Sequence, residues 1–246
     1  MKKVLVLDSG SGGINILHEC VKVCPYFDYL FFADNKNLPY GEKSNEELIE
    51  ITRNNLNIIK SFFNFEIVIF ACNTITATTI SKMREEFCDV IFIGTEPAIN
   101  LALKKYKPNE ILLIATESTI KNNSLIKKNF DRGMHFKVIK NLPNLIDENL
   151  FSTYLLQDYI TKELKDFSKC KSVILGCTHF HAIEKEIKKA LKNIEVFSSA
   201  KGVAKRLSNF TTETNKNFNL QFMVSGNYLD LQKFYAYFNY IDLMNL

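Results

Sequence analysis

The sequence lacks the features that direct a chain into a membrane or out of the cell. Met1-Lys2-Lys3 is followed by only four apolar residues before Asp8, too few for the apolar core of a secretory signal peptide. No apolar run approaches the roughly 18 residues that a membrane-spanning helix needs. We therefore expect a cytoplasmic protein with no membrane partner.

The cysteines and histidines lack the spacing of common metal and redox sites. The chain has six cysteines and four histidines, but no CxxC pair and no zinc-ligand spacing. In a reducing cytoplasm these cysteines are expected to be free thiols. The sequence predicts neither a disulfide framework nor a structural metal.

Charge of one sign does not dominate the chain. It has 31 Lys and Arg residues against 27 Asp and Glu residues, a net charge of +4. The lysine-rich stretches 104–107 and 185–189 lie beside acidic residues or at helical spacing, without the regular stacking aromatics of a nucleic-acid site. We interpret them as solvated helix faces and expect no nucleic-acid partner. The length of 246 residues and the 46% hydrophobic content instead predict one large or two small globular domains.

Short apolar runs alternate regularly with stretches of helical spacing. Fully apolar strands that alternate with helices are typical of parallel sheets covered on both faces, so the predicted fold class is α/β. Ser44 and Glu47 indicate a capping box, and Pro97 suits the first turn of a helix. The predicted strands are 3–7, 29–32, 67–70, 90–93, 111–115, 136–139, 172–175, 195–197 and 222–224. The predicted longer helices are 14–23, 48–63, 74–87, 146–164, 182–191, 200–207 and 229–238, with a further helix after Thr119.

Polar residues follow several of these strands at their carboxyl ends, where ligands bind in open parallel sheets. Two of the strand ends share one pattern of strand, small residue, cysteine and two polar residues: EIVIFACNT at 66–74 and SVILGCTHF at 172–180. This repeat predicts two halves facing each other across a cleft, residues 1–93 with 208–246, and residues 94–207. The polar strand ends are Asp8-Ser9, Cys72-Asn73-Thr74, Thr116 and Cys177-Thr178-His179.

The glycine-rich stretch from Asp8 to Gly13 does not fit the familiar phosphate-binding or nucleophile motifs. It lacks the third glycine of a dinucleotide fingerprint, the Gly-Lys-Ser/Thr of a phosphate loop and the first glycine of a hydrolase elbow. What remains is a carboxylate and a hydroxyl at a strand end, followed by backbone N–H groups that open a helix and suit an anion. The alternative is a tight strand-to-helix turn with no ligand.

Cys72 and Cys177 are the strongest candidates for chemistry. A single cysteine after an apolar strand is commonly a small buried hydrophobe. Both residues, however, are expected at strand-to-helix junctions, where the helix dipole and free N–H groups favour a thiolate, and both precede polar residues. The remaining cysteines lack this setting and are interpreted as packing or surface residues: Cys20, Cys24, Cys88 and Cys170.

Three chemistries could use two thiols at one cleft. A redox pair usually has the close CxxC spacing, which is absent. A protease of the Cys–His–Asn type could use Cys177, His179 and Asn73, but His179 lies only two residues from Cys177 rather than across a cleft. A symmetric acid–base pair fits the duplicated halves best, because one thiolate can remove a proton from one face of a carbon while the other thiol supplies one to the opposite face. That chemistry is racemisation or epimerisation.

These motifs resemble the cofactor-independent glutamate racemases of the aspartate/glutamate racemase superfamily. The resemblance runs along nearly the whole chain and implies two pseudosymmetric α/β domains with the active site between them. It implies no pyridoxal phosphate, no other cofactor and no metal, and, since such proteins commonly dimerise, a homodimer. The matching motifs are DSGSGG (8–13), LPYGEKS (38–44), ACNT (71–74), GTEPA (94–98), GCTHF (176–180) and SGN (225–227).

The resemblance also implies roles for individual residues. Cys72 would take the α-proton from D-glutamate and Cys177 the α-proton from L-glutamate, with Asp8 and His179 assisting the adjacent thiols. Hydroxyl, amide and backbone N–H groups would hold the carboxylates and stabilise the charge that develops as the α-carbon ionises. The implied substrate-binding residues are Asp8, Ser9, Tyr40, Gly41, Asn73, Thr74, Thr116, Thr178 and His179.

The chain departs from the family pattern at several positions. His181 replaces the usual proline after the second cysteine motif, and Ser11 replaces a small apolar residue in the glycine loop. Ser198 stands where many members carry an aspartate. Asp147-Glu148 resembles the region that supplies an auxiliary acid, within divergent surroundings. These departures leave substrate choice and regulation open.

The sequence therefore predicts a glutamate racemase that supplies D-glutamate for peptidoglycan. The alternative within the same class is a racemase for aspartate or another acidic amino acid, because a shorter side chain needs only a deeper carboxylate anchor. The alternative from another class is a non-catalytic amino-acid-binding paralogue, against which the retention of Cys72, Cys177, Asp8 and His179 argues.

Overall fold

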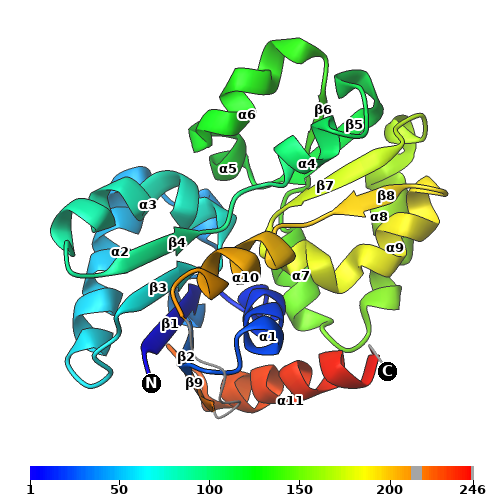
Figure 1. The fold of residues 1–246 in the computed structure, drawn as a ribbon. Helices are drawn as coiled ribbons and strands as arrows, with labels where there is room; N and C mark the ends of the chain where they lie inside the picture. Colours follow the sequence, from blue (N-terminus) through cyan, green and yellow to red (C-terminus); the bar gives the residue numbers. More distant parts are fainter. Residues whose placement is uncertain (212–217, 245–246) are drawn as a thin grey trace.

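The computed structural model describes residues 1–211 and 218–244, and its strands form two sheets in which every pairing is parallel (Figure 1). Helices flank both sheets, which confirms the predicted α/β fold class. The first sheet, in the order β4-β3-β1-β2-β9, contains β1 (Lys3–Asp8), β2 (Asp28–Ala33), β3 (Ile67–Phe70), β4 (Ile91–Gly94) and β9 (Asn219–Val224). The second, in the order β6-β5-β7-β8, contains β5 (Ile111–Ala115), β6 (His135–Val138), β7 (Ser172–Gly176) and β8 (Glu195–Phe197).

Both faces of the inner strands are buried, which explains why β1, β3, β5 and β7 are mainly continuous apolar runs. In β1, Val4 and Val6 join one hydrophobic cluster, while Leu5 and Leu7 join another. Successive side chains of a strand point to opposite faces, so the two clusters lie on opposite sides of the sheet. The first cluster also contains residues of the second sheet, such as Leu112, so one apolar core links the two sheets.

The helices begin and end close to their predicted positions in most of the chain. The capping box is confirmed, since Glu47 N–H donates to Ser44 Oγ at 3.2 Å and Ser44 N–H donates to Glu47 Oε2 at 2.9 Å. The α-helices are α1 (Gly13–Val23), α2 (Asn45–Lys60), α3 (Asn73–Glu86), α4 (Ile99–Leu103), α5 (Glu117–Asn122), α6 (Ser124–Asn129), α7 (Leu142–Glu148), α8 (Gln157–Leu164), α9 (Glu184–Leu191), α10 (Ala200–Ser208) and α11 (Tyr228–Met244). The 3-10 helices are η1 (Asn35–Asn37), η2 (Tyr40–Glu42), η3 (Pro108–Glu110), η4 (Phe130–Arg132), η5 (Thr153–Leu156), η6 (Lys165–Phe167) and η7 (Thr178–Ile183).

The predicted continuous helix 146–164 is wrong. The chain instead forms α7, the 3-10 turn η5 and then α8. Asn149 ends α7, because its side-chain amide donates to the carbonyl of Leu145 at 2.9 Å and so satisfies one of the free carbonyls at the helix end.

Three other helix starts also differ from the prediction. The helix predicted at 182–191 begins as an α-helix only at Glu184, after the 3-10 turn η7. Pro97 precedes the cap of α4 rather than occupying its first turn, because α4 begins at Ile99 after Ala98. The helix expected after Thr119 starts earlier, with Thr116 as its cap accepting the Thr119 N–H at 3.3 Å.

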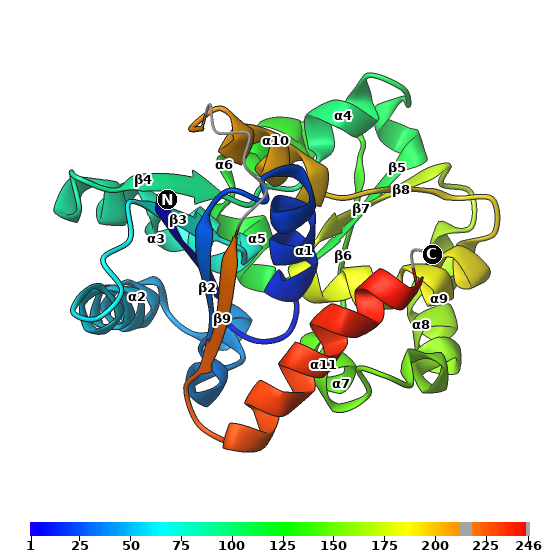
Figure 2. The same cartoon turned by 60° about the horizontal axis from the view of Figure 1, so that its bottom comes forward.

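The C-terminal segment returns to the first sheet. Strand β9 pairs with β2, and α11 then runs across α1 toward the side of the molecule where α7 lies (Figure 2). Helix α10 packs against α1, so helices that follow both sheets meet there. The division of the chain at 93/94 and 207/208 stays a prediction; in the structure, β4 extends to Gly94 and α10 to Ser208.

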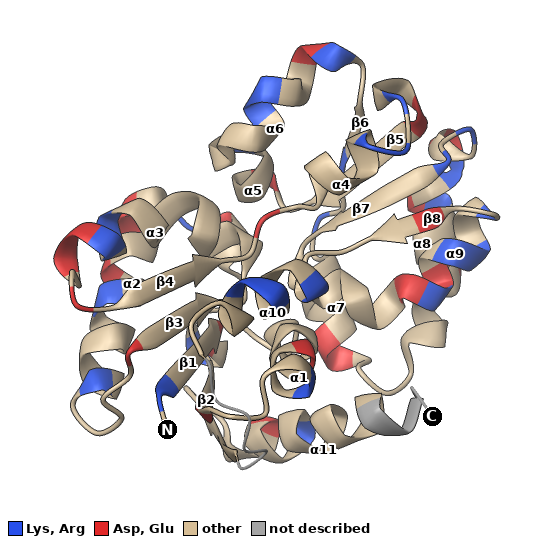
Figure 3. Ribbon diagram, in the orientation of Figure 1, with Lys and Arg blue, Asp and Glu red and all other residues tan. Residues whose placement is uncertain are grey.

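Charged residues lie mainly on the outer helices, and both signs are mixed there (Figure 3). In the two lysine-rich stretches, Lys105 pairs with Glu195 at 2.5 Å and Lys188 with Glu184 at 2.5 Å. No helix in residues 1–211 and 218–244 is both long and apolar enough to cross a membrane.

Candidate active site

A cavity of about 210 Å³ lies where the carboxyl ends of strands from the two sheets meet. Its walls come from the segments that follow β1, β2 and β3 of the first sheet and β5, β6 and β7 of the second. This is the position where the strand-end rule places ligands in α/β proteins. The lining residues are Ser9, Leu38–Glu42, Cys72, Thr74, Thr116, Glu117, Val138–Asn141, Pro143, Asn144, Cys177 and His179.

The structure brings the predicted site residues together. Most of them line the cavity directly: Ser9, Tyr40, Gly41, Cys72, Thr74, Thr116, Cys177 and His179. Asp8, Asn73 and Thr178 do not line it; each is buried behind it. Thr178 Oγ1 donates to Asp8 Oδ1 at 3.4 Å, and Asn73 Nδ2 donates to the Thr95 carbonyl at 3.2 Å.

Cys72 caps helix α3 directly after strand β3 and is 6% exposed. Burial raises the pKa of its thiol well above the usual value, and the nearby charge of Asp8 raises it further. The backbone N–H groups of Thr74 and Ile75 lower the pKa but do not offset the burial. Cys72 is therefore a protonated thiol at neutral pH when the cavity holds no ligand, which suits a proton donor.

Asp8 is a fully buried carboxyl group held by the glycine loop. Its Oδ2 accepts the N–H groups of Gly13 at 2.8 Å and Gly10 at 3.3 Å. Burial raises the pKa of Asp8 to about 6, although the charge of His179 and these N–H groups lower it. Such a pKa lets Asp8 exchange a proton near neutral pH, next to the Cys72 thiol.

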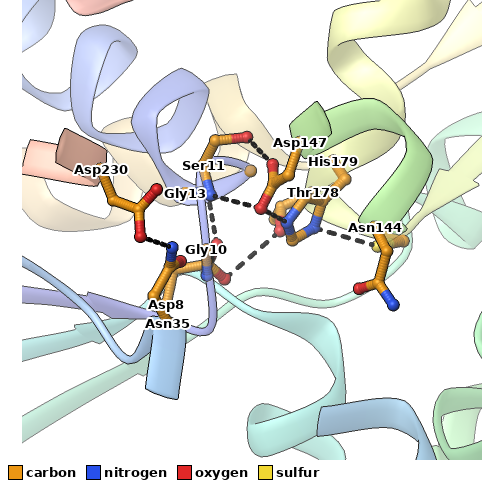
Figure 4. Close-up of polar contacts among 12 residues, drawn as sticks. Asp8, Gly10, Ser11, Gly13, Asn35, Asn144, Asp147, Thr178, His179 and Asp230 are labelled. Atoms are coloured by element: carbon orange, nitrogen blue, oxygen red, sulfur yellow. Dashed lines mark hydrogen bonds and ion pairs between the residues drawn. The ribbon is translucent and has the colours of Figure 1, made fainter. Parts of the chain in front are cut away.

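Cys177 ends a row of polar contacts on the opposite side of the cavity. Its Sγ lies 3.7 Å from His179 Nδ1, and His179 Nε2 lies 3.4 Å from Asp147 Oδ2 as an ion pair without the geometry of a directed hydrogen bond (Figure 4). Burial alone would lower the pKa of His179, but the Asp147 carboxylate and the Cys177 sulfur outweigh it and hold the pKa well above its usual value. The His179 imidazolium therefore lies beside the Cys177 sulfur.

Tyr40 is held by an aspartate that the sequence prediction did not include in the site. The buried phenol donates to Asp34 Oδ2 at 2.7 Å, and Asp34 also accepts from Asn55 at 2.9 Å and Ser225 at 2.5 Å. Asp34 thus connects the loop of Tyr40 to α2 and to the turn that follows β9. Asp34 directly follows strand β2, so the strand-end rule could have identified it.

Three threonine hydroxyls join the two sides of the cavity. Thr74 Oγ1 at the start of α3 lies 3.1 Å from Thr116 Oγ1 and 3.4 Å from Thr119 Oγ1, both at the start of α5. Gly41 also approaches Thr116, since a Cβ on Gly41 would lie 3.1 Å from the Thr116 Cβ. The hydroxyls of Thr74 and Thr116 are therefore fixed near each other and can donate to a carboxylate.

The segment after β6 lines the cavity but was missed by sequence reasoning. It runs from Val138 to Asn144 and includes Lys140. It follows a strand of the same sheet as Cys177, so its place in the chain was a usable signal. Its backbone is irregular: Asn141 adopts a left-handed conformation with φ of 59°.

Two departures from the family pattern lie away from this cavity. His181 and Ser198 line a second cleft of about 610 Å³, which helices α1, α9, α10 and α11 border. Burial lowers the pKa of His181 to about 4, so its imidazole is neutral at physiological pH.

The chain is similar to known glutamate racemases over most of its length, although no protein-family model matches it. A glutamate racemase of Clostridium acetobutylicum is 31% identical over 210 residues, which cover 82% of this chain and 81% of that protein. Glutamate racemase 2 of Bacillus subtilis is 34% identical over 224 residues, covering 87% and 83%. The crystal structure of a glutamate racemase isoform from Bacillus anthracis superimposes with a TM-score of 0.82 at 27% identity, covering 94% of this chain and 91% of that one. By sequence and by fold, the chain belongs to the glutamate racemase family.

Proposed function

We propose that this protein interconverts L- and D-glutamate through two cysteine thiols. The observation that carries the proposal is that Cys72 and Cys177, at matching strand ends of two different sheets, line one cavity. Inversion at a carbon needs an acid–base group on each of its two faces, and this arrangement supplies them. The substrate is taken from the relatives named as glutamate racemases.

In the direction from L- to D-glutamate, Cys177 acts as the base. Its thiolate, stabilised by the imidazolium of His179, takes the α-proton, so the C–H bond breaks and an S–H bond forms. The Cys72 thiol, protonated at rest because its pKa is raised, gives its proton to the opposite face of the carbon. The two thiols have then exchanged protonation states, which is the state needed for the reverse reaction.

In the direction from D- to L-glutamate, Cys72 must first lose its proton. Asp8 is the adjacent group suited to receive it, because its pKa of about 6 lies near neutral pH and its charge already acts on Cys72. Asp8 would thus assist Cys72 as His179 assists Cys177. The assisting groups differ in charge type, so the two halves of the site are not chemically equivalent.

The carboxylates of the substrate are held by neutral donors. We assign this to the hydroxyls of Ser9, Thr74 and Thr116 and to backbone N–H groups of the loop at Tyr40–Gly41 and of the cysteine loops. Asn73, Thr178 and Asp8 act from behind the cavity wall rather than on its surface. Donors that are already in place stabilise the negative charge that spreads onto the α-carboxylate as the proton leaves.

The test is racemisation by the purified protein with no added cofactor. L-glutamate and L-aspartate are incubated in parallel. The circular dichroism signal of each L-enantiomer is followed over time, and exchange of the α-proton is followed in D₂O. Loss of the signal with glutamate supports the proposal. Loss with aspartate alone would assign the alternative substrate, and binding without exchange of either would assign a non-catalytic amino-acid-binding protein.

We also propose a cellular role and an oligomeric state for this protein. The product, D-glutamate, would supply peptidoglycan synthesis in the cytoplasm, so the gene should rescue a bacterium that requires D-glutamate. The resemblance to the family also supports a homodimer, which light scattering on the purified protein measures directly.

A further inference from the structure

Ser11 of the glycine loop contacts Asp147, which belongs to the segment following the other sheet. Ser11 follows β1 and is 1% exposed, whereas Asp147 lies on α7 after β6. The Ser11 hydroxyl donates to Asp147 Oδ1, and the Ser11 N–H donates to Oδ2 at 3.4 Å. Among the described residues, Ser11 supplies both hydrogen bonds that this carboxylate receives.

The same carboxylate faces the histidine beside Cys177. Asp147 Oδ2 lies 3.4 Å from His179 Nε2, and His179 Nδ1 lies 3.7 Å from Cys177 Sγ. Figure 4 shows Asp147 between Ser11 and His179. Because Cys177 Sγ lies beside the other nitrogen of the His179 ring, the four residues form one row from the glycine loop to the thiol. Through these contacts, Ser11 after β1 of the first sheet influences Cys177 after β7 of the second sheet.

The backbone around this row leaves little room for another arrangement. A Cβ on Gly10 would lie 2.5 Å from Asp147 Oδ2 and 2.9 Å from His179 Nε2. On the other side, Lys233 of α11 donates to the backbone carbonyl of Asp147 and fixes the end of α7. The position of the Asp147 backbone is thus set by α11, and the orientation of its carboxylate is set by Ser11.

We propose that Ser11 is a positioning residue for the half of the reaction that Cys177 carries out, because it holds Asp147 in place against His179. The inference rests on the racemase function proposed above.

Removing the hydroxyl has a definite consequence. Asp147 Oδ1 loses its donor inside a largely buried site, so its carboxylate either turns away from His179 or binds a proton more readily. The remaining groups that act on His179 are then the charge of Asp8 and the Cys177 sulfur. With a weaker partner, the imidazolium is less stable, and so is the thiolate beside it.

The test compares Ser11→Ala with Ser172→Ala. Ser172 is a matched control, because it is fully buried on the strand that leads to Cys177, yet its hydroxyl has no partner among the described residues. Relative to the wild type, Ser11→Ala should lower kcat/KM for glutamate about tenfold, as expected for a lost hydrogen bond to a charged group. Ser172→Ala should leave it unchanged.

A second readout separates positioning from general damage. With glutamate deuterated at the α-carbon, Cys177 breaks the C–D bond only in the direction from L to D. If Ser11→Ala slows the Cys177 step, the isotope effect rises for L-glutamate and falls for D-glutamate. If the substitution damaged the site without affecting one thiol more than the other, the isotope effects for L- and D-glutamate would change in the same direction. That result would overturn the proposal.

The failure of this inference and the failure of the proposed function are distinguishable. If the wild type does not racemise glutamate, the function fails, and titration of the His179 ring by NMR still tests the contact: the pKa of His179 should be lower in Ser11→Ala than in Ser172→Ala. Equal values, or wild-type kinetics in Ser11→Ala, would overturn the inference. If Ser11→Ala does not fold, Asp147→Asn should give the same asymmetry of isotope effects, and symmetric effects there count against the proposal.

Discussion

Cys72 and Cys177 occupy the same backbone position in two different sheets. Cys72 has φ of −131° and ψ of 125°, and Cys177 has φ of −142° and ψ of 138°; each is the extended residue between a buried parallel strand and the turn that follows. The turns differ: α3 has 14 residues, while η7 is a 3-10 helix of six. The repeat in the sequence thus corresponds to a repeat in the structure at the point where the chemistry is proposed.

The first prediction concerns these two thiols. Cys72→Ser and Cys177→Ser should each lower racemisation of glutamate by at least about 100-fold, the lower range for loss of a positioned acid–base group, because serine is a far weaker acid of similar size. Circular dichroism at the glutamate band measures the loss. Cys88→Ser is the control, since Cys88 is exposed and does not line the cavity. Near-normal activity in either cavity variant would refute the assignment of two bases.

The second prediction tests the close approach of the glycine loop to the opposite half. In Gly10→Ala the new methyl group would meet Asp147 Oδ2 at 2.5 Å and His179 Nε2 at 2.9 Å, so the loop or the ion pair must shift. We expect a loss of racemase activity with the fold retained. Gly202→Ala is the matched control, because a Cβ there meets nothing within 4 Å in α10.

For Gly202→Ala we also expect a small change in stability. Alanine is favoured over glycine within a helix by roughly 0.5–1 kcal/mol, so Gly202→Ala should unfold at slightly higher denaturant concentration with unchanged activity. If Gly10→Ala behaved like Gly202→Ala in both measurements, the close approach of the glycine loop to Asp147 would be refuted.

Much of the fold was predictable because each fully buried strand consists mainly of consecutive apolar residues. Strand β3 was predicted at its observed bounds, 67–70, since all four of its side chains are buried. Strand β9 was predicted three residues too short, because it is an edge strand whose polar Asn219 and Gln221 interrupt the run. Asn219 and Gln221 are exposed while Leu220 and Phe222 are half-buried, so one face of this end of the strand is open to solvent and the sequence carries a weaker signal.

The site was predictable only where residues stand directly at strand ends. Cys72 and Cys177 could be identified, because position along the chain places them at the cavity. The resemblance indicated Asp147-Glu148 as the region of an auxiliary acid, but the contact between Asp147 and His179 could not be predicted, because it depends on how far α7 extends and the sequence suggested a single long helix there. Asp147's partner Ser11 was identified only as a departure from the family pattern in the glycine loop, with no contact assigned to it. The contact between them exists only once the two sheets are packed together.

The third prediction concerns the buried hydrogen bonds of Asp34. Tyr40→Phe removes the phenol that donates to Asp34 Oδ2 at 2.7 Å, while Asp34 keeps its bonds from Asn55 and Ser225. The free energy of unfolding should fall by about 1.5–3 kcal/mol, the usual cost of losing one buried hydrogen bond to a charged group. The KM for glutamate should rise, because the loop that carries Gly41 is less well fixed.

Urea unfolding and steady-state kinetics measure the two effects of Tyr40→Phe. Tyr154→Phe is the control, since Tyr154 is 65% exposed and should change neither quantity. A loss of stability without any change in KM would show that Asp34 stabilises the fold but does not contribute to substrate binding.

The last prediction follows from the pKa of Asp8. Its carboxyl group is fully buried, and burial raises its pKa from 3.8 to about 6, so the folded protein binds this proton more tightly than the unfolded chain does. The contribution to stability is therefore full below about pH 4 and is lost as the pH rises through about 6. The change of pKa corresponds to roughly 3 kcal/mol of differential stability.

Asp8→Asn isolates this contribution, because asparagine has nearly the same shape and does not titrate. Between pH 4.5 and pH 7.5, urea unfolding should show the wild type losing about 2 kcal/mol of stability relative to Asp8→Asn, because part of the full contribution is already lost at pH 4.5. A constant difference across this range would mean that Asp8 is already ionised at pH 4.5. In that case its pKa would be too low for a base that takes the proton of Cys72 near neutral pH, and the D-glutamate half of the proposed mechanism would need another base.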